Sequence, residues 1–329
     1  MRRLGLFLLL IAAVAIGSIL FNRRNEVGSV NDAIDVLKSS FDSGGTTFGN
    51  DENAGPPGQT IRIASFNLGI LGPKKLEDPE VMAAIGGILR QFDVVALQEI
   101  RSAQPGTVAR LLDWINMESD QYACVASHRI GRTSQREQYA FVYRRASIEL
   151  DTSQSYVVND PDDLLHREPY VVWCRVRGPE PDRSFTFSLV NVHTDPDEVR
   201  QEMQWLDDVF RQVRDDGRGE DDVIMLGDFN AHQENMGELR TLAGFHAAIQ
   251  SETTNTRRTK QYDNLIFSTM ATSEFTGRSG VFDFYHQLDL TMDEALKISD
   301  HLPVWAEFTV TEGGNDRLAR TTSTPVSLQ

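Results

Sequence analysis

Several apolar segments of this chain begin or end beside side chains that can ligate a metal or move a proton. The side chains are Asn67 after 61–66, Glu99 after 94–98, His193 after 185–192, Asp228 and Asn230 after 223–226, and Asp300 and His301 before 302–310. Carboxylate and amide oxygens are hard ligands for Mg²⁺, and imidazoles exchange protons near neutral pH. Metal-assisted hydrolysis of a phosphate ester requires this combination of residue types.

These residues need a fold that brings the ends of strands together. Helical spacing of apolar residues occurs at 79–91 and 108–117, and a long helix is predicted from Pro196 to Val213 with Asp195 as its N-cap. The predicted strands are 61–66, 94–98, 140–143, 170–176, 185–192, 223–226, 265–267 and 302–310. The excess of strands over helices predicts an α/β (α+β) fold with two packed β-sheets flanked by helices. Sheets of this kind carry active sites at their strand ends.

Four blocks of sequence resemble, in the same order, the signature blocks of the endonuclease/exonuclease/phosphatase superfamily. They are Ile63–Asn67 (IASFN), Leu97–Arg101 (LQEIR), Gly227–Ala231 (GDFNA) and Ser299–Val304 (SDHLPV). Further similarity, at 131–141, 167–169 and 282–301, points to the deoxyribonuclease I branch of that superfamily. The resemblance covers residues 60–310, and it implies a four-layer sandwich of two mixed sheets.

The resemblance implies a metal site built from oxygen ligands. Glu99 would be the principal ligand of Mg²⁺, with Asn67 beside it. Asp228 and Asn230 would bind the metal or the scissile phosphate, and Asp300 would complete the acidic cluster. Mn²⁺ and Ca²⁺ are alternative ions for the same ligands.

The resemblance also implies two catalytic histidines on opposite sides of the phosphate. His193 would pair with Glu137, and His301 would pair with Asp263. A carboxylate partner fixes the tautomer of an imidazole and raises its pKa. One histidine would help to generate the attacking hydroxide and the other would protonate the leaving 3′ oxygen, with either assignment open.

Four residues are implied to contact the substrate, and one of them departs from the family. Arg101 and Arg167 match arginines that contact phosphate or a DNA groove, and Asn230 would contact the scissile phosphate. Gln135 stands where deoxyribonuclease I has a tyrosine against the minor groove, and Asn264 stands where it has an arginine. Gln135 can donate a hydrogen bond in a groove but offers no stacking ring, so the metal chemistry is retained while the preference for DNA weakens.

The composition bears on nucleic-acid binding and on disulfide formation. The net charge is −16 over 329 residues, which argues against binding nucleic acid through a broad basic surface. It does not exclude an enzyme that cleaves nucleic acid, because a bound cation offsets charge locally. The two cysteines, Cys124 and Cys174, do not match the disulfide cysteines of the secreted nuclease. Buried free thiols are expected, and a disulfide between the two is the alternative.

The N-terminus predicts membrane targeting. The apolar run Leu4–Phe21 has arginines on both sides and, at about 18 residues, is just long enough to span a membrane. Residues 1–24 are therefore predicted to be an uncleaved signal anchor with the catalytic domain outside the cytoplasm. A signal peptide cleaved near Ala13–Ala15, and hence a secreted protein, is the alternative.

The remaining segments flank one domain. Residues 25–59 are rich in glycine and polar residues and predict a flexible linker, and 60–310 form the catalytic domain. Residues 311–329 have no apolar periodicity and predict a disordered tail. We expect a monomer.

The predicted activity is that of a Mg²⁺-dependent phosphodiesterase, and most closely that of an endonuclease acting on DNA. A phosphatase or phospholipase C-type phosphodiesterase acting on inositol phosphates, phospholipids or nucleotides is the first alternative, although the sequence has no evident apolar loop to hold a lipid. A non-catalytic binding module is the second. It would require the loss of catalytic positions, none of which is missing.

Overall fold

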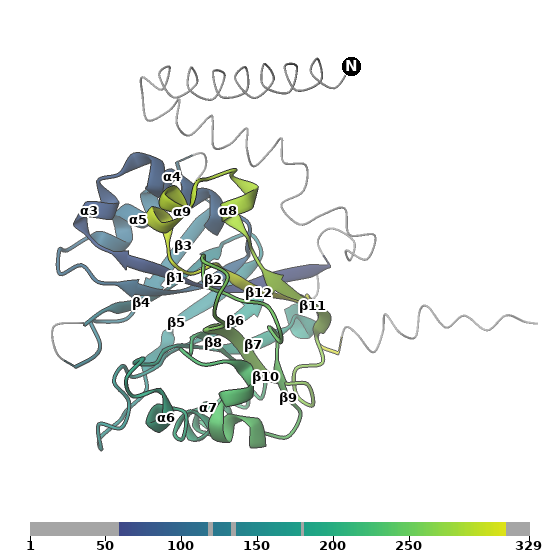
Figure 1. The fold of residues 1–329 in the computed structure, drawn as a ribbon. Helices are drawn as coiled ribbons and strands as arrows, with labels where there is room; N and C mark the ends of the chain where they lie inside the picture. Colours follow the sequence, from purple (N-terminus) through teal and green to yellow (C-terminus); the bar gives the residue numbers. More distant parts are fainter. Residues whose placement is uncertain (1–58, 118–120, 133–135, 179–180, 314–329) are drawn as a thin grey trace, which may run out of the picture.

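The computed structural model describes residues 59–117, 121–132, 136–178 and 181–313. Within them, two six-stranded mixed sheets lie face to face, and helices cover the outer face of each sheet (Figure 1). The predicted four-layer α/β sandwich is confirmed.

The first sheet has the strand order β11-β12-β1-β2-β4-β3. Its strands are β1 (Thr60–Leu71), β2 (Val94–Ile100), β3 (Tyr122–Ala126), β4 (Gln138–Arg144), β11 (Phe275–Val281) and β12 (Val304–Thr309). The strand β1 is parallel to β2 and antiparallel to β12. The end of β1, which carries Asn67, therefore lies beside the end of β2 and the start of β12.

The second sheet has the strand order β5-β6-β7-β8-β10-β9. Its strands are β5 (Ile148–Val157), β6 (Tyr170–Val176), β7 (Thr186–His193), β8 (Val223–Asp228), β9 (Phe245–Ala247) and β10 (Asp263–Ser268). The parallel pairing of β7 with β8 sets His193 opposite Asp228, and the antiparallel pairing of β10 with β8 sets Asp263 opposite Asp228. The register alone thus aligns three of the predicted site residues in one row.

Apolar side chains fill three layers. The space between the sheets holds residues from both, among them Phe141, Phe187 and Phe308, each 0% exposed. The helices are α3 (Pro73–Leu76), α4 (Pro79–Leu89), α5 (Thr107–Ile115), α6 (Val199–Glu202), α7 (Leu206–Arg214), α8 (Phe284–Gln287) and α9 (Met292–Ile298), with short 3₁₀ turns at Pro181–Arg183, Gln233–Asn235 and Gly237–Thr241. Helices α4, α5 and α9 cover the first sheet and α7 covers the second.

The prediction of one continuous helix over Pro196–Val213 is wrong. The chain forms two helices there, α6 and α7, and the first begins after Glu198 rather than after Asp195. The Asp195 side chain accepts the backbone N–H of Asp197, which makes a turn instead of a helix cap. Glu202 is 1% exposed, and its carboxylate accepts the backbone N–H groups of His166 and Asp195 at 2.6 Å each. These tertiary hydrogen bonds hold the chain in a shape that one straight helix does not allow.

The described chain continues slightly past the expected end of the domain. Thr311 pairs with Ser184, and the Glu312 carboxylate accepts the backbone N–H of Thr186 at 2.8 Å. The predicted anchor at 1–24 lies outside the described residues, as do the predicted linker up to residue 58 and residues 314–329 of the predicted tail. Across the part of the chain that the structure describes, no helix combines the length and apolar character needed to span a membrane. Cys124 and Cys174 are free thiols.

The close approach of β7 and β8 gives a stability prediction at Gly227. Its φ is +154°, and a Cβ there would lie 1.9 Å from the Val192 carbonyl oxygen. We expect Gly227→Ala to lower the free energy of unfolding by more than about 2 kcal/mol, measured by chemical denaturation. Gly277→Ala is the control: its φ is +83° with nothing within 4 Å of the new Cβ, so it should cost only backbone strain of about 1–2 kcal/mol. Equal losses for the two variants would contradict the prediction.

Candidate active site

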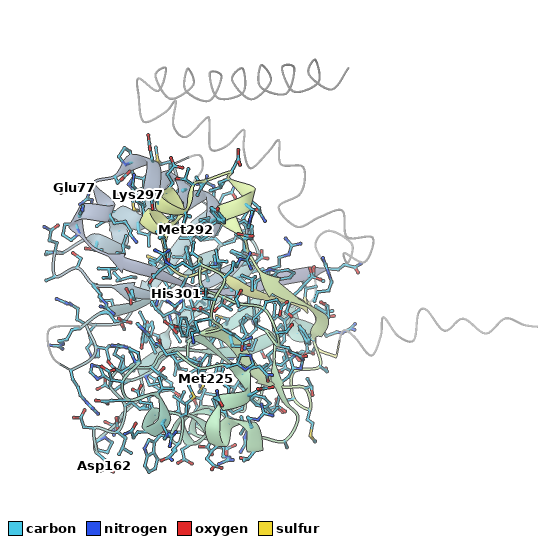
Figure 2. The ribbon with its side chains drawn as sticks, in the orientation of Figure 1. Glu77, Asp162, Met225, Met292, Lys297 and His301 are labelled. Carbon is cyan, nitrogen blue, oxygen red and sulfur yellow. The ribbon has the colours of Figure 1, made fainter. Side chains whose placement is uncertain are left out.

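Asp228 lies at the centre of the candidate site, at the end of β8. The residue is 1% exposed, and Asn67 of β1 donates from Nδ2 to its Oδ2 at 3.0 Å. The same oxygen lies 3.5 Å from Nε2 of His193 and 3.6 Å from Nε2 of His301. His193 belongs to the second sheet, and His301 precedes β12 of the first sheet; Figure 2 labels His301 in the middle of the molecule. Imidazoles from the two sheets therefore face one carboxylate.

His193 is held by Glu137, which lies just before β4. Nδ1 of His193 is 2.8 Å from Oε1 of Glu137, a residue that is 0% exposed. Two arginines flank the same carboxylate: Arg101 Nε lies 3.5 Å from Oε2, and Arg167 Nε lies 4.0 Å from Oε1. A buried carboxylate needs such partners because desolvation strongly disfavours its charge. With Nδ1 occupied by Glu137, the Nε2 atom is the one left for chemistry.

His301 is held in the same way by Asp263, the first residue of β10. Its Nδ1 lies 2.9 Å from Oδ2 of Asp263, and the Thr254 hydroxyl donates to that oxygen at 2.7 Å. The backbone N–H of His301 donates to the Ser299 hydroxyl at 3.0 Å. The ring of Tyr262 lies 5.8 Å from the His301 ring. The orientation of this imidazole is therefore fixed from several sides.

The two histidine–carboxylate pairs differ in charge balance. Burial would raise the pKa of Glu137, but His193 and the two arginines outweigh burial and lower it. Burial raises the pKa of Asp263, and the nearby charge of Asp228 adds to this. Burial would lower the pKa of both histidines, yet Glu137 raises the pKa of His193, and Asp263 with Asp228 raises that of His301 to about 10. The His301 pair therefore carries more uncompensated negative charge around its imidazole.

Glu99 reaches the site through an unusual backbone conformation. It has a φ of +62°, a region that non-glycine residues seldom adopt and that is often found at functional sites. Its Oε2 accepts the backbone N–H of Ile70 at 2.6 Å, and its Oε1 accepts Arg101 Nη2 at 2.9 Å. Arg101 thereby joins Glu99 to the Glu137 carboxylate described above.

The predicted metal ligands surround the end of β1. Asn67 contacts Asp228, and Glu99 bonds to Ile70 three residues beyond Asn67. Asp300 borders the same turn, because a Cβ placed on Gly69 would lie 3.0 Å from its Oδ1. All four predicted ligands offer carboxylate or amide oxygens, the donors that hard divalent cations such as Mg²⁺ prefer. This donor set fits the predicted ion.

A tighter group, formed by Asp228, Asp263 and His301, holds ligand-type atoms within 4.8 Å of one another. Asp263 occupies Nδ1 of His301 at 2.9 Å, and Nε2 of the same ring lies 3.6 Å from Asp228. We therefore interpret this group as a polar network that positions His301.

Arg167, a predicted substrate contact, is buried behind His193. Its side chain is 1% exposed. Its Nε and Nη2 donate to the backbone carbonyls of His193 and Thr194 at 2.9 and 3.0 Å. In this position Arg167 supports His193 and Glu137. Gln135, the predicted groove contact, lies outside the described residues.

Asn230 orders the loop that follows β8. Its backbone N–H donates to Asp228 Oδ1 at 2.9 Å, and its Nδ2 donates to the Thr194 carbonyl at 2.9 Å. Asn230 also has a positive φ, of +48°. Every predicted site residue among the described ones thus falls within one connected region.

Sequence reasoning missed several residues of this region. Lys75 Nζ donates to the carbonyls of Leu68 and Gly69 at 2.6 Å each and of Ile298 at 2.9 Å, which ties down the end of β1. Burial lowers the pKa of Lys75 to about 8, against the opposing charges of Asp300 and Glu99. No spacing rule marks such a lysine, since its partners are backbone carbonyls distant in sequence.

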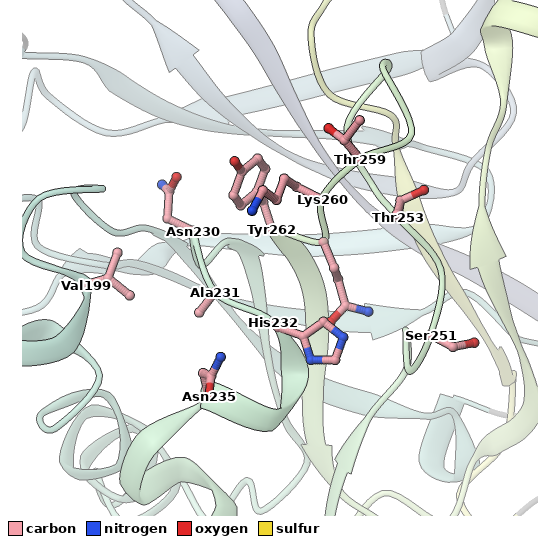
Figure 3. Close-up of a pocket in the computed structure, with 11 residues that line it drawn as sticks. Val199, Asn230, Ala231, His232, Asn235, Ser251, Thr253, Thr259, Lys260 and Tyr262 are labelled. Atoms are coloured by element: carbon pink, nitrogen blue, oxygen red, sulfur yellow. The ribbon is translucent and has the colours of Figure 1, made fainter.

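A pocket beside the site was also not predicted. It has a volume of about 430 Å³ and is lined by Asn230, His232, Lys260 and Tyr262 among others (Figure 3). Asn230 lines the pocket from the loop after β8, and Lys260 and Tyr262 line it from the loop before β10. The Nδ1 atom of His232 accepts the backbone N–H of Glu234 at 3.3 Å. Loop residues without a motif gave no earlier signal of the pocket.

The fold and this site define an enzyme of phosphoester hydrolysis. Residues 64–301 match the model of the endonuclease/exonuclease/phosphatase family, and the chain belongs to that family. Within it, the chain is 35% identical over 259 residues to deoxyribonuclease-1-like 1 of Bos taurus, covering 75% of this chain and 80% of that protein. It is 34% identical over 265 residues to deoxyribonuclease gamma of Mus musculus, covering 74% of this chain and 83% of that protein.

Solved structures support the fold. The catalytic domain of human Nocturnin with a bound sulfate anion superposes with a TM-score of 0.51 at 15% identity, covering 77% of this chain and 94% of that one. Truncated Caenorhabditis elegans TDP2 gives a TM-score of 0.52 at 16% identity, covering 76% of this chain and 98% of that one. At these identities the likeness concerns the arrangement of the sheets and helices.

The charge environment of His301 gives a titration prediction. In metal-free protein with EDTA, we expect Asp263→Asn to lower the pKa of His301 from about 10, because the charges of Asp228 and Asp300 then oppose burial without that of Asp263. Histidine NMR titration of the full chain measures this change. Glu137→Gln is the matched control, which should lower the pKa of His193 and leave that of His301 high. An unchanged His301 pKa in Asp263→Asn would refute the pairing.

Proposed function

We propose that this enzyme is a divalent-metal-dependent endonuclease that hydrolyses phosphodiester bonds of DNA. The main support for this proposal is the pair of buried histidines whose Nε2 atoms lie 3.5 and 3.6 Å from one Asp228 oxygen. The deoxyribonuclease names of its relatives support DNA as the substrate class.

The two imidazoles divide the proton transfers of hydrolysis between them. One accepts the proton of the attacking water, and the other donates a proton to the leaving 3′ oxygen. Each ring is locked by a carboxylate on Nδ1, through Glu137 for His193 and Asp263 for His301, so that only Nε2 faces the reacting atoms. Arg167 and Thr254 act on these carboxylates and are positioning residues.

Glu99, Asn67, Asp228 and Asp300 would hold the metal. When bound, a Mg²⁺ ion supplies Lewis-acid neutralisation of charge on the phosphate. Asn230, placed by its bonds to Asp228 and Thr194, orients the phosphate from the loop after β8. Arg101 contacts both Glu99 and Glu137, and so fixes the proposed metal ligand relative to the carboxylate that holds His193.

We also propose that residues 1–24 hold the domain at a membrane, with the enzyme facing away from the cytoplasm. The apolar run Leu4–Phe21 between arginines supports this. Fractionation of cells that express the full chain, or a chain lacking residues 1–24, tests it. Recovery of the full chain only in the soluble fraction, at full length, would contradict the anchor.

Removal of one imidazole should abolish most of the activity without unfolding the domain. We expect His193→Gln and His301→Gln each to lower plasmid nicking by about 10²-fold or more, because each removes a general acid or base. The measurement is the initial rate of conversion of supercoiled to nicked plasmid. His128→Gln changes an exposed histidine and should retain the wild-type rate. Retained activity in both active-site variants would exclude the proposed mechanism.

The substrate class is tested by a panel of phosphoesters assayed side by side. We expect the full chain with Mg²⁺ to nick plasmid DNA and EDTA to abolish the activity. Glu99→Gln should lower the rate sharply at fixed Mg²⁺ and recover part of it at higher concentration, because it loses a ligand charge. The other substrates are an inositol polyphosphate, sphingomyelin vesicles and a nucleotide. Faster hydrolysis of any of these, with no nicking of DNA, would replace the endonuclease with that activity.

A further inference from the structure

A second group of acidic side chains lies at the opposite end of β8 from the active site. Asp222 precedes β8, whereas Asp228 ends it. Six residue steps at a strand rise of about 3.3 Å separate the two carboxylates by about 20 Å. Asp222 is joined there by Glu274, which precedes β11, and by Glu312, which follows β12. Ligand-type oxygens of these three residues lie within 4.8 Å of one another.

Asp222 and Glu274 are buried, Glu312 is half-buried, and two of the carboxylate oxygens lack hydrogen-bond partners among the described residues. Asp222 is 5% exposed and Glu274 is 1% exposed. Oδ1 of Asp222 and Oε2 of Glu274 have no hydrogen-bond partner among the described residues. Native proteins seldom leave buried polar atoms unsatisfied, so these atoms point to a missing ligand.

The hydroxyl of Thr272 is a further oxygen beside this group. Thr272 is 1% exposed, and its hydroxyl lies beside the Asp222 carboxylate without the geometry of a hydrogen bond. A hydroxyl oxygen in this position can join carboxylates around a cation.

We propose that Asp222, Glu274 and Glu312 bind a divalent cation of the calcium type, with Thr272 beside it. Ca²⁺ binds oxygen ligands at about 2.3–2.6 Å, so two ligands of one ion lie at most about 5 Å apart. The observed spacing, within 4.8 Å, meets this limit without rearrangement. Mg²⁺ takes shorter bonds, of about 2.0–2.1 Å, so its ligands would have to lie closer together.

The remaining hydrogen bonds of these residues position them for the ion. The Glu274 Oε1 accepts the backbone N–H of Gly313 at 2.5 Å, and the Glu312 Oε1 accepts that of Thr186 at 2.8 Å. Glu220, the fourth acid, already accepts Trp173 Nε1 at 3.0 Å and the backbone N–H of Asp222 at 3.1 Å. A cation here joins the last described residues of the chain to the starts of β8 and β11. Its role is to secure the two sheets to each other, independently of catalysis.

The test is thermal unfolding of the full chain after EDTA treatment, with and without added CaCl₂, together with equilibrium dialysis against radioactive Ca²⁺. At a Ca²⁺ concentration near 100-fold above Kd, we expect the Tm to rise by about 5–10 °C. Glu274→Gln and Glu312→Gln should lose this rise and bind one ion fewer. Each glutamine retains an Oε1 acceptor for the backbone N–H, so both variants should fold.

Two comparisons separate this site from the catalytic one. Glu99→Gln is a matched loss of one carboxylate in the active site, and it should keep the part of the Ca²⁺-dependent rise in Tm that Glu274→Gln loses. In EDTA, Glu274→Gln should be at least as stable as the wild type, because it removes repulsion within a cation-free cluster. The readouts are stability and stoichiometry, so a failure of the proposed nuclease activity would leave this result unaffected.

Three outcomes would overturn the proposal. The first is a wild-type Tm that Ca²⁺ does not change, which would mean that the carboxyl groups share protons instead of an ion. The second is a rise in Tm that persists in both Glu274→Gln and Glu312→Gln. The third is a rise that disappears in Glu99→Gln alone, which would assign the ion to the active site.

Discussion

The burial of the Asp228 carboxylate is the constraint on which the rest of the site depends. A charge that is 1% exposed is costly unless partners surround it. Asn67 comes from β1, His193 from β7 and His301 from the segment before β12, so the partners belong to both sheets. The two sheets must therefore be packed together before this carboxylate can be accommodated, and the site is complete only in the folded sandwich.

The same constraint explains why each histidine has its own buried carboxylate. Two imidazoles beside one Asp228 would each rotate freely if only Nε2 were held. Glu137 and Asp263 bind the two Nδ1 atoms and leave both Nε2 atoms directed at one point. The arginines beside Glu137 make the two halves unequal in charge, although their geometry is similar. Chemistry that needs both an acid and a base can use such an inequality.

Much of the fold and site could be predicted from local sequence. Strand ends with Asn67, Glu99, His193 and Asp228 are visible because an apolar run followed by a polar residue is a short-range pattern. The helix predicted from Pro196 to Val213 starts only after Glu198, because the Asp195 N–H bonds to the Glu202 carboxylate and Asp195 forms a turn instead of a helix cap. A carboxylate that caps distant backbone groups leaves no trace in spacing.

The sequence by itself determined the family and the positions of the strand-terminal polar residues and the two histidines, because these lie in contiguous blocks. Only the tertiary structure decided that Arg167 is buried behind His193, that Lys75 ties down the end of β1, and that Asp222 meets Glu312 at the far end of the sheets. These contacts join residues far apart in the chain, and their geometry follows from sheet register and packing. Local patterns carry no information about such distances, so they could be read only from the folded molecule.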